Sequence, residues 1–189
     1  MQKQILITLA TALACAAPPA FAQKLKQSEQ ATVVSREQIQ AVATKFKGGD
    51  HEVQVVDVGP YNVGVAVLSR GALKAGGPLN GINHTKITEA YYVVSGEGTF
   101  ITANDAGVTN VKPLAADNEL VTTVVGPGNM ATITKVLNSV HVKTGDVVVI
   151  PPGIYHGFSE IPDHIEYVTI RPDMNKVLPG GYINPEVKK

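Results

Sequence analysis

The sequence predicts an all-β domain, a sandwich or a barrel, preceded by one short helix. Beyond residue 50, short β-branched runs alternate with glycine, proline and asparagine, which is the pattern of strands joined by turns. No long helical periodicity follows, and many short strands without a long helix favour a sandwich or barrel. The expected strands are residues 52–58, 62–68, 90–94, 99–102, 130–136, 146–150 and 164–170.

The composition is that of a single globular domain. The chain has 189 residues and is 44% hydrophobic, which is enough to bury one core. Sixteen basic residues balance sixteen acidic ones, and neither sign forms a run of five. We therefore expect neither nucleic acid nor an anionic membrane surface as a partner.

Residues 1–22 have the features of a secretory signal peptide. They combine a cationic start at Lys3, an apolar run over residues 5–17 and a small-x-small site at residues 20–22. Cleavage after Ala22 is expected, which predicts a periplasmic or secreted protein without stable membrane insertion.

Two alternatives for this N-terminus have weaker support. A membrane anchor requires a longer apolar run, and Pro18 and Pro19 interrupt this one. Lipid attachment at Cys15 usually requires a large aliphatic residue three positions upstream, where Ala12 stands. Since Cys15 is the only cysteine and leaves with the signal peptide, any metal in the mature chain must be held by nitrogen and oxygen.

The segment 23–50 is expected to be a polar leader followed by a short helix. Ser35 and Gln38 resemble a capping box, and apolar residues then recur at helical spacing until Gly48 and Gly49 end the pattern. These apolar residues are Ile39, Val42 and Phe46. The β-domain is expected over residues 51–173, with a long insertion, a candidate hairpin, at 104–129, and an extended tail over 174–189.

Two motifs carry the candidate chemistry. In the first, His84 and Glu89 open a strand that ends in the glycine turn Gly96-Glu-Gly98. In the second, an apolar strand after Gly145 runs into Pro151-Pro-Gly153 and then His156. Glycine supplies the positive φ angles that such tight corners need.

Together these motifs resemble the two conserved motifs of the cupin superfamily, and the resemblance covers roughly residues 62–170. It implies a double-stranded β-helix, a jelly-roll barrel, in which histidines and a glutamate chelate one metal. The usual His-x-His of the first motif is absent, because either Ile82 or Lys86 takes the place of one histidine. A lysine ammonium cannot be a ligand.

The resemblance therefore leaves three expected metal ligands, His84, Glu89 and His156. Two histidines and one carboxylate with open positions suit one divalent metal, and iron, manganese, zinc and nickel stay open. His84 and Glu89 are five positions apart, so a regular strand would send them to opposite faces. The interpretation requires a bend or bulge between them.

Two further residues are candidates for catalysis. Alternation from Glu89 directs Tyr91 into the barrel, where it either contacts substrate or belongs to the core. Lys86 either lies on the surface or points into the barrel mouth as an anion contact or proton donor. The remaining histidines, His51, His141 and His164, match no motif and are assigned no role.

Alternation also predicts which neighbouring side chains face inward and which face outward. Val93 and Phe158 share the inward parity of the ligands, while Tyr92 and Tyr155 have the opposite parity. The two outward tyrosines are expected to pack against another strand or a second subunit. Resemblance to cupins implies that a homodimer through a sheet face is possible.

Two functions stay open at this point. One is a metal-dependent enzyme acting on a small organic molecule, an oxygenase or an isomerase, with dioxygenase-type chemistry fitting the ligand set best. The other is a non-catalytic periplasmic module that binds a small ligand or the metal itself. An enzyme should place further acid-base groups beside the ligands, whereas a binding module should have mainly apolar walls.

Overall fold

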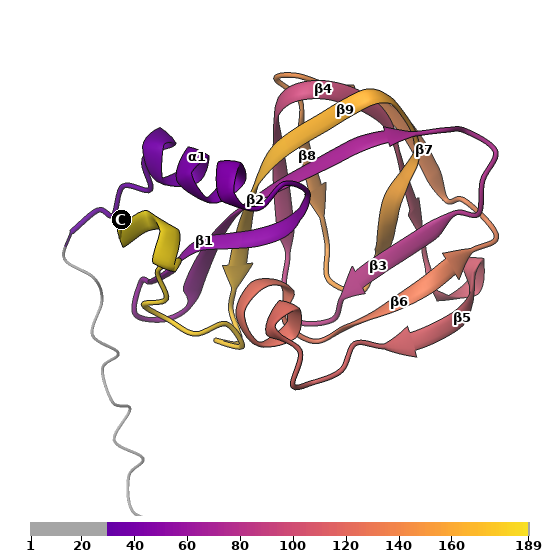
Figure 1. Ribbon diagram of the computed structural model, residues 1–189. Coiled ribbons are helices and arrows are strands. Elements are labelled where there is room, and N and C mark those ends of the chain that lie inside the picture. The colour runs from indigo at the N-terminus through magenta and orange to yellow at the C-terminus, as the bar shows by residue number, and fades with distance from the viewer. Residues whose placement is uncertain (1–29, 189) are drawn as a thin grey trace, which may run out of the picture.

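The computed structural model describes residues 30–188, and the predicted signal peptide lies outside this range. The described chain is mostly β, as predicted, with one short α-helix (Figure 1). The helices are α1 (Arg36–Lys45), η1 (Asp105–Gly107), η2 (Leu120–Val125) and η3 (Pro185–Lys188). The strands are β1 (Gly49–Asp57), β2 (Asn62–Leu73), β3 (Asn80–His84), β4 (Glu89–Ala103), β5 (Val108–Pro113), β6 (Gly128–Ile133), β7 (Asn138–Lys143), β8 (Val147–Ile150) and β9 (Tyr155–Asp173).

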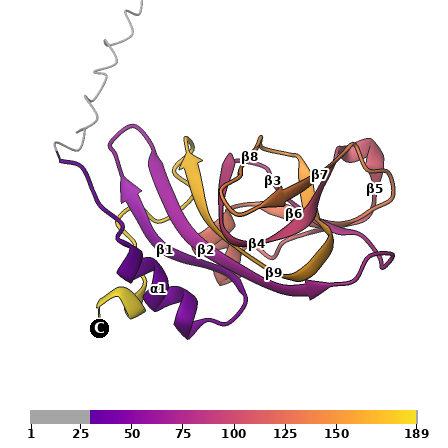
Figure 2. The ribbon, with the colours of Figure 1, turned by 90° about the horizontal axis from the view of Figure 1, so that it is seen from above.

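The long strands β4 and β9 form the centre of the fold, and all strand pairs are antiparallel. β9 pairs with β2 along its second half and contacts β3 near its start, so the hydrogen-bonded path runs β1-β2-β9-β3-β6-β5. β4 pairs with β9 and additionally with β7 and β8. The strands curve around a common interior in an incompletely closed jelly roll, seen from the side and from above in Figures 1 and 2.

The main difference from the sequence prediction is in the number of strands. The predicted strands at 90–94 and 99–102 are one strand, because β4 continues through the glycine turn with bulges rather than ending there. The short strands β3, β5 and β7 were not predicted. β3 contains Asn and Gly, which ordinarily indicate turns, and most of β5 and β7 is exposed and lacks a buried apolar face.

The segment 104–129 contains structure of its own. β5 pairs with β6, so a hairpin does form here, and its connection contains the six-residue π-helix η2. Val121, Val124 and Val125 of η2 are buried, and two residues of this segment, Leu120 and Val125, line the interior of the barrel.

Helix α1 begins as the sequence predicts. The Gln38 amide donates to Ser35 Oγ, and the Ser35 amide donates to the Gln38 side chain, which completes the capping box. The buried face of the helix packs through Val42 on Val53 and Val67, on the outside of β1 and β2. Figure 2 shows α1 lying outside the barrel beside these strands.

The C-terminal segment lies along β1. The Val55 amide donates to the Tyr182 carbonyl oxygen at 2.9 Å, and Leu178 is buried against Val55 and Ile87. The segment ends in the single turn of η3 near α1, so it is not extended throughout. Among residues 30–188, no helix has the length and apolar character needed to cross a membrane.

Candidate metal centre

The three expected ligands meet inside the barrel. His84 ends β3, Glu89 begins β4 and His156 lies near the start of β9, and all three side chains are buried. The residues between His84 and Glu89 form a bend outside any strand, which is the interruption that the spacing of five required. Each strand therefore presents its ligand to the same point.

The two motifs are hydrogen-bonded to each other near the ligands. The Gly153 amide donates to the His84 carbonyl oxygen at 2.8 Å, and the Asn83 side chain donates to the Gly153 carbonyl oxygen at 3.3 Å. Gly153 has φ of +85°, a conformation that other residues adopt only with strain. The turn before His156 thus holds the end of β3 in register with the start of β9.

One carboxylate oxygen is the centre of the cluster. Glu89 Oε2 lies 3.2 Å from His84 Nε2 and 3.2 Å from His156 Nε2. The Tyr91 hydroxyl donates to the same oxygen at 3.0 Å. One potential donor atom from each of the three residues, a ring nitrogen or a carboxylate oxygen, lies within 4.8 Å of the other two.

One nitrogen of each histidine, Nε2, faces this oxygen. His156 Nδ1 is 3.0 Å from the Ile154 carbonyl oxygen, which can only accept, so Nδ1 carries the hydrogen of this bond and Nε2 faces Glu89. Burial lowers the pKa of His84 below its ordinary value, which favours the neutral form of the His84 ring. Burial acts to raise the pKa of Glu89, but the Arg171 charge and the two histidines hold it well below the ordinary value.

These atoms fit a divalent metal. His156 Nε2 and His84 Nδ1 are buried without a hydrogen-bond partner among the described residues, and an unpaired buried polar atom is costly. A neutral nitrogen lone pair beside a carboxylate oxygen is stabilised by a cation between them. The group His84, Glu89 and His156 could hold a metal, and its nitrogen and oxygen donors suit iron, manganese, zinc or nickel.

A buried arginine, not anticipated from the sequence, holds the other oxygen of Glu89. Arg171 Nε donates to Glu89 Oε1 at 2.6 Å, Nη1 donates to Glu52 Oε2 at 3.4 Å, and Nη2 donates to Asp50 Oδ2. The Arg171 side chain is fully buried. A buried arginine surrounded by three carboxylates fixes the position of Glu89 on the side away from the histidines.

Glu52 is an unusual member of this arginine cluster. Burial raises its pKa to about 8, against the opposing charge of Arg171, so the carboxyl is protonated at neutral pH. The Glu52 side chain fits only because residue 64 is glycine, since a Cβ at that position would lie 2.9 Å from Glu52 Oε1.

Alternation would have indicated Arg171. The predicted strand stopped at residue 170, but β9 continues to Asp173, and Ile165, Tyr167, Thr169 and Arg171 are all buried on its inner face. An arginine at an inward position of an extended strand is a recognisable sign of a buried ion pair. Asp50 and Glu52 could not be found in this way, because a bulge between Glu52 and Gln54 changes the alternation of β1.

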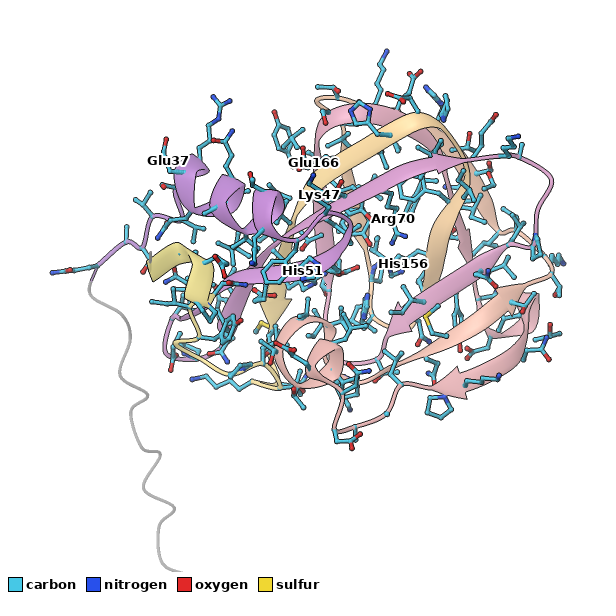
Figure 3. The ribbon with its side chains drawn as sticks, viewed as in Figure 1. Glu37, Lys47, His51, Arg70, His156 and Glu166 are labelled. Atoms are coloured by element: carbon cyan, nitrogen blue, oxygen red, sulfur yellow. The ribbon has the colours of Figure 1, made fainter. Side chains whose placement is uncertain are left out.

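A cavity of about 460 Å³ opens beside the candidate metal centre. His84, His156 and Tyr91 line it, and so does Arg70, whose side chain enters the interior together with that of His156 (Figure 3). Most of the wall is apolar, from residues that include Leu68, Ile82, Met130, Phe158 and Ile161. The cavity thus connects the two histidines with an arginine that the sequence analysis did not single out.

The two candidate catalytic residues differ in position. Tyr91 faces the interior as predicted, and burial together with the Glu89 charge raises the pKa of its hydroxyl well above the ordinary value. Lys86 is exposed in the bend before β4 and does not line the cavity. The structure therefore brings Tyr91 to the site and leaves Lys86 on the surface, which was one of its two predicted positions.

Side-chain direction agrees with the predicted alternation. Val93 and Phe158 are buried in the main core, while Tyr92 is 49% exposed. Tyr155 points away from the site and is buried against the side chains of other strands, including Ala131 and Ile133 of β6. His51, His141 and His164 lie outside the site, each with a local partner.

Comparison with solved structures finds similar proteins at low identity. One is an uncharacterised protein with a double-stranded β-helix domain from Klebsiella pneumoniae, with a TM-score of 0.37 and 16% identity over 66% of this chain and 79% of that one. A Bacillus halodurans protein has a TM-score of 0.45 and 12% identity over 84% and 92%. The DMSP lyase DddQ from Ruegeria pomeroyi has a TM-score of 0.39 and 12% identity over 66% and 46%.

Sequence comparison supplies the family. A search of curated proteins found no match to this chain. The family model described as Cupin matches residues 42–176, which is most of the described chain and includes both motifs and Arg171. The chain therefore belongs to the cupin family.

Proposed function

We propose that this cupin binds one divalent metal through His84, Glu89 and His156 and acts on a small organic molecule in the adjoining cavity. The observation that carries the proposal is the unpaired Nε2 of His156, buried and directed at Glu89 Oε2. In the neutral ring this nitrogen has no protein donor, whereas a cation between them would be bound by both the nitrogen and the carboxylate oxygen.

Each neighbouring group has a definable part in this function. The bond from His156 Nδ1 to the Ile154 carbonyl oxygen keeps Nε2 free as a donor atom. Arg171 holds Glu89 Oε1 and so directs Oε2 toward the histidines. A metal bound by only three protein ligands keeps open positions at which it can polarise a carbonyl, activate water or bind dioxygen.

Elemental analysis tests the metal site. Protein purified without added metal or nickel affinity should contain close to one metal per chain, and the His84→Ala/Glu89→Ala/His156→Ala variant should contain none. His141→Ala is the matched control, since His141 is an exposed histidine paired with Glu97. Wild-type protein that stays metal-free even after reconstitution with iron, manganese, zinc and nickel would sink the proposal.

A non-catalytic binding module is the second candidate function. It is favoured by the mainly apolar wall of the cavity and by the position of Lys86 outside it, which removes one of the two expected acid-base groups. Incubation of the metal-loaded protein with a bound small molecule separates the two functions. Product formation that depends on the metal indicates an enzyme, and recovery of the unchanged molecule indicates a binding module.

Export is part of the proposal. The cationic, apolar and small-x-small pattern of residues 1–22 supports cleavage after Ala22 and a periplasmic or secreted location. N-terminal sequencing of protein from a periplasmic extract should begin at Gln23. A chain that begins at Met1 in the cytoplasmic fraction would contradict export.

We further propose a homodimer through the outer face of β4, β8 and β9. Tyr92, Val147, Val149 and Ile170 are exposed on these strands, and Tyr92 is directly opposite Val147 in the sheet. Contiguous exposed apolar side chains on one face are typical of an interface. Sedimentation should give twice the monomer mass, and Val147→Lys should shift the equilibrium toward monomer.

A further inference from the structure

Arg70 is the cavity residue that the proposed metal site does not use. Along β2, Ala66 and Leu68 are buried on the inner face, and Arg70, two positions further on, has the same parity but is exposed. Arg70 lines the same cavity as His84 and His156, and Figure 3 shows its side chain and that of His156 in the same interior space. Arg70 thus lines the cavity while its side chain stays in contact with solvent, so a ligand can reach it from outside.

The side chain is held in place by aromatic residues. Arg70 Nε donates to the Tyr167 hydroxyl at 3.1 Å, and the guanidinium carbon lies 5.9 Å from the centroid of the Phe158 ring. Tyr167 is fully buried and Phe158 nearly so. These two contacts orient the guanidinium plane and use only Nε, one of the three nitrogens.

The terminal nitrogens of Arg70 are available to a ligand. No carboxylate within residues 30–188 forms a salt bridge with Arg70. Asp50, the acidic residue that lines the cavity, is paired with Arg171 instead. Arg171 is held by three acidic side chains, whereas Arg70 lines the cavity and forms no direct ion pair among the described residues.

The charge around the cavity favours an anion. Asp50 and Glu89 are negative, Arg171 is positive, and Glu52 is protonated at neutral pH because burial raises its pKa to about 8. A divalent metal at the histidines would make the sum of these charges positive, and Arg70 adds a further positive charge.

Aromatic rings connect the two positive centres. Phe158, beneath the guanidinium, lies 5.5 Å from Phe100 between ring centroids, and Phe100 lies 6.2 Å from His156. Tyr91 lies 6.0 Å from His156 by the same measure. A small molecule spanning the cavity would have an apolar surface along its length, a cation at the Arg70 end and the candidate metal at the other.

We infer that Arg70 binds the carboxylate of the substrate, so that the substrate class is a small organic acid with an apolar or aromatic body. This inference rests on the proposed function for the term substrate and for the metal's share of the positive charge, while the guanidinium that would bind the anion is that of Arg70 with or without a metal. The planar guanidinium fork matches a carboxylate in two parallel hydrogen bonds. A carboxylate is favoured over a phosphate because the cavity offers a single unpaired cation and mainly apolar walls.

Calorimetric titration with matched acids and amides tests the inference. The probes are acetate, succinate and benzoate, each compared with its neutral amide, together with inorganic phosphate. At least one carboxylate should bind tenfold more tightly than its amide. The Arg70→Gln variant should weaken that carboxylate about ten- to hundredfold, as expected for losing charge-assisted hydrogen bonds, and should leave binding of the amide unchanged.

Two further variants guard against a trivial loss of folding. Arg70→Lys keeps the charge without the fork and should retain part of the affinity. Lys143→Gln removes a positive charge from the exposed side of β7 and should bind like the wild type. The thermal unfolding of each variant is measured in parallel.

The outcomes separate this inference from the proposed function. Metal content is measured on the same samples, so Arg70-dependent carboxylate binding by a metal-free protein supports the anion site and overturns only the metal proposal. Equal affinity of wild type and folded Arg70→Gln for every carboxylate overturns the inference. So does a wild type that binds none of the carboxylates at millimolar concentration, or one that prefers phosphate.

Discussion

The two oxygens of Glu89 lie in different surroundings. Oε1 accepts from Arg171, whose remaining nitrogens are bound by Asp50 and Glu52, so this side of the carboxylate is closed by protein groups. Oε2 faces His84 and His156, whose nitrogens are not all paired, and beyond them lies the cavity. The Oε1 side has all its partners within the protein, whereas nitrogens on the Oε2 side lack a partner among the described residues.

This difference separates a supporting role from a binding role. A carboxylate ligand is more effective when its second oxygen is held, because its orientation is then set before the metal arrives. Arg171 provides that support from β9, and β1 supplies the carboxylates that hold Arg171 in turn. β1 and the helix packed on it therefore contribute to the site although they hold none of its ligands.

The largest effect on stability is expected from replacing Arg171, the residue that holds Glu89 Oε1. Arg171→Met should leave the carboxylates of Glu89 and Asp50 without their counter-charge, and breaking a buried ion pair in this way costs about 3–5 kcal/mol. The free energy of unfolding in urea measures the loss. Lys143→Gln should change stability by less than about 0.5 kcal/mol, and an Arg171→Met protein as stable as the wild type would refute the supporting role of the arginine.

Metal binding beside Glu89 Oε2 should stabilise the folded protein. A metal at a concentration a hundredfold above its dissociation constant adds about 2.7 kcal/mol to the free energy of unfolding. The measurement compares wild type with and without the metal identified by elemental analysis. His156→Ala should lose the metal-dependent increase while still folding, and an increase that survives in this variant would place the metal elsewhere.

The pH dependence of stability should identify Glu52. Its folded-state pKa is raised from 4.5 to about 8, so the folded chain retains a proton that the unfolded chain has already released in this range. The free energy of unfolding should therefore fall as pH rises from about 4.5 to about 8, by at most about 1.4 kcal/mol per pH unit. Glu52→Gln, which imitates the protonated form, should flatten this decline, and identical pH profiles would contradict the raised pKa.

The smallest effect on stability is expected at Tyr91. Tyr91→Phe removes one buried hydrogen bond to Glu89 Oε2 and should cost about 1 kcal/mol in urea unfolding. Metal affinity should fall about tenfold or more, since the hydroxyl orients a ligand oxygen. If the metal-loaded variant binds a carboxylate normally but no longer converts it, Tyr91 has the catalytic role predicted for it. Unchanged turnover would leave it a positioning residue.

Local sequence was sufficient for the features that depend on neighbours in the chain. The capping box at Ser35, the turn before His156 and the inward alternation of Tyr91 each involve a few adjacent residues, and the structure has all three. The three candidate ligands were implied by the resemblance of the two motifs to those of cupins. The odd spacing of five between His84 and Glu89 predicts a bend, because a regular strand would send them to opposite faces.

Long-range pairing accounts for what the sequence analysis missed. Arg171 and Asp50 are 121 positions apart and meet only because β2 lies between β1 and β9 in the sheet. Glu52 faces inward and Val53 outward to α1, but a bulge between Glu52 and Gln54 shifts the alternation, so the face of Glu52 does not follow from the rest of β1. Arg70 reaches the cavity because β2 extends beyond its predicted end at Leu68 to Leu73.

The sequence alone thus specified the turns and the inward or outward direction of side chains near the motifs, because turn chemistry and alternation act over short distances. Resemblance to the cupin motifs implied the barrel and the three residues that could hold a metal. The support of Glu89 by Arg171 and the free guanidinium of Arg70 depend on strand register across the sheet. Register is set by the packing of the whole barrel, and a shift of one residue would send either arginine to the opposite face.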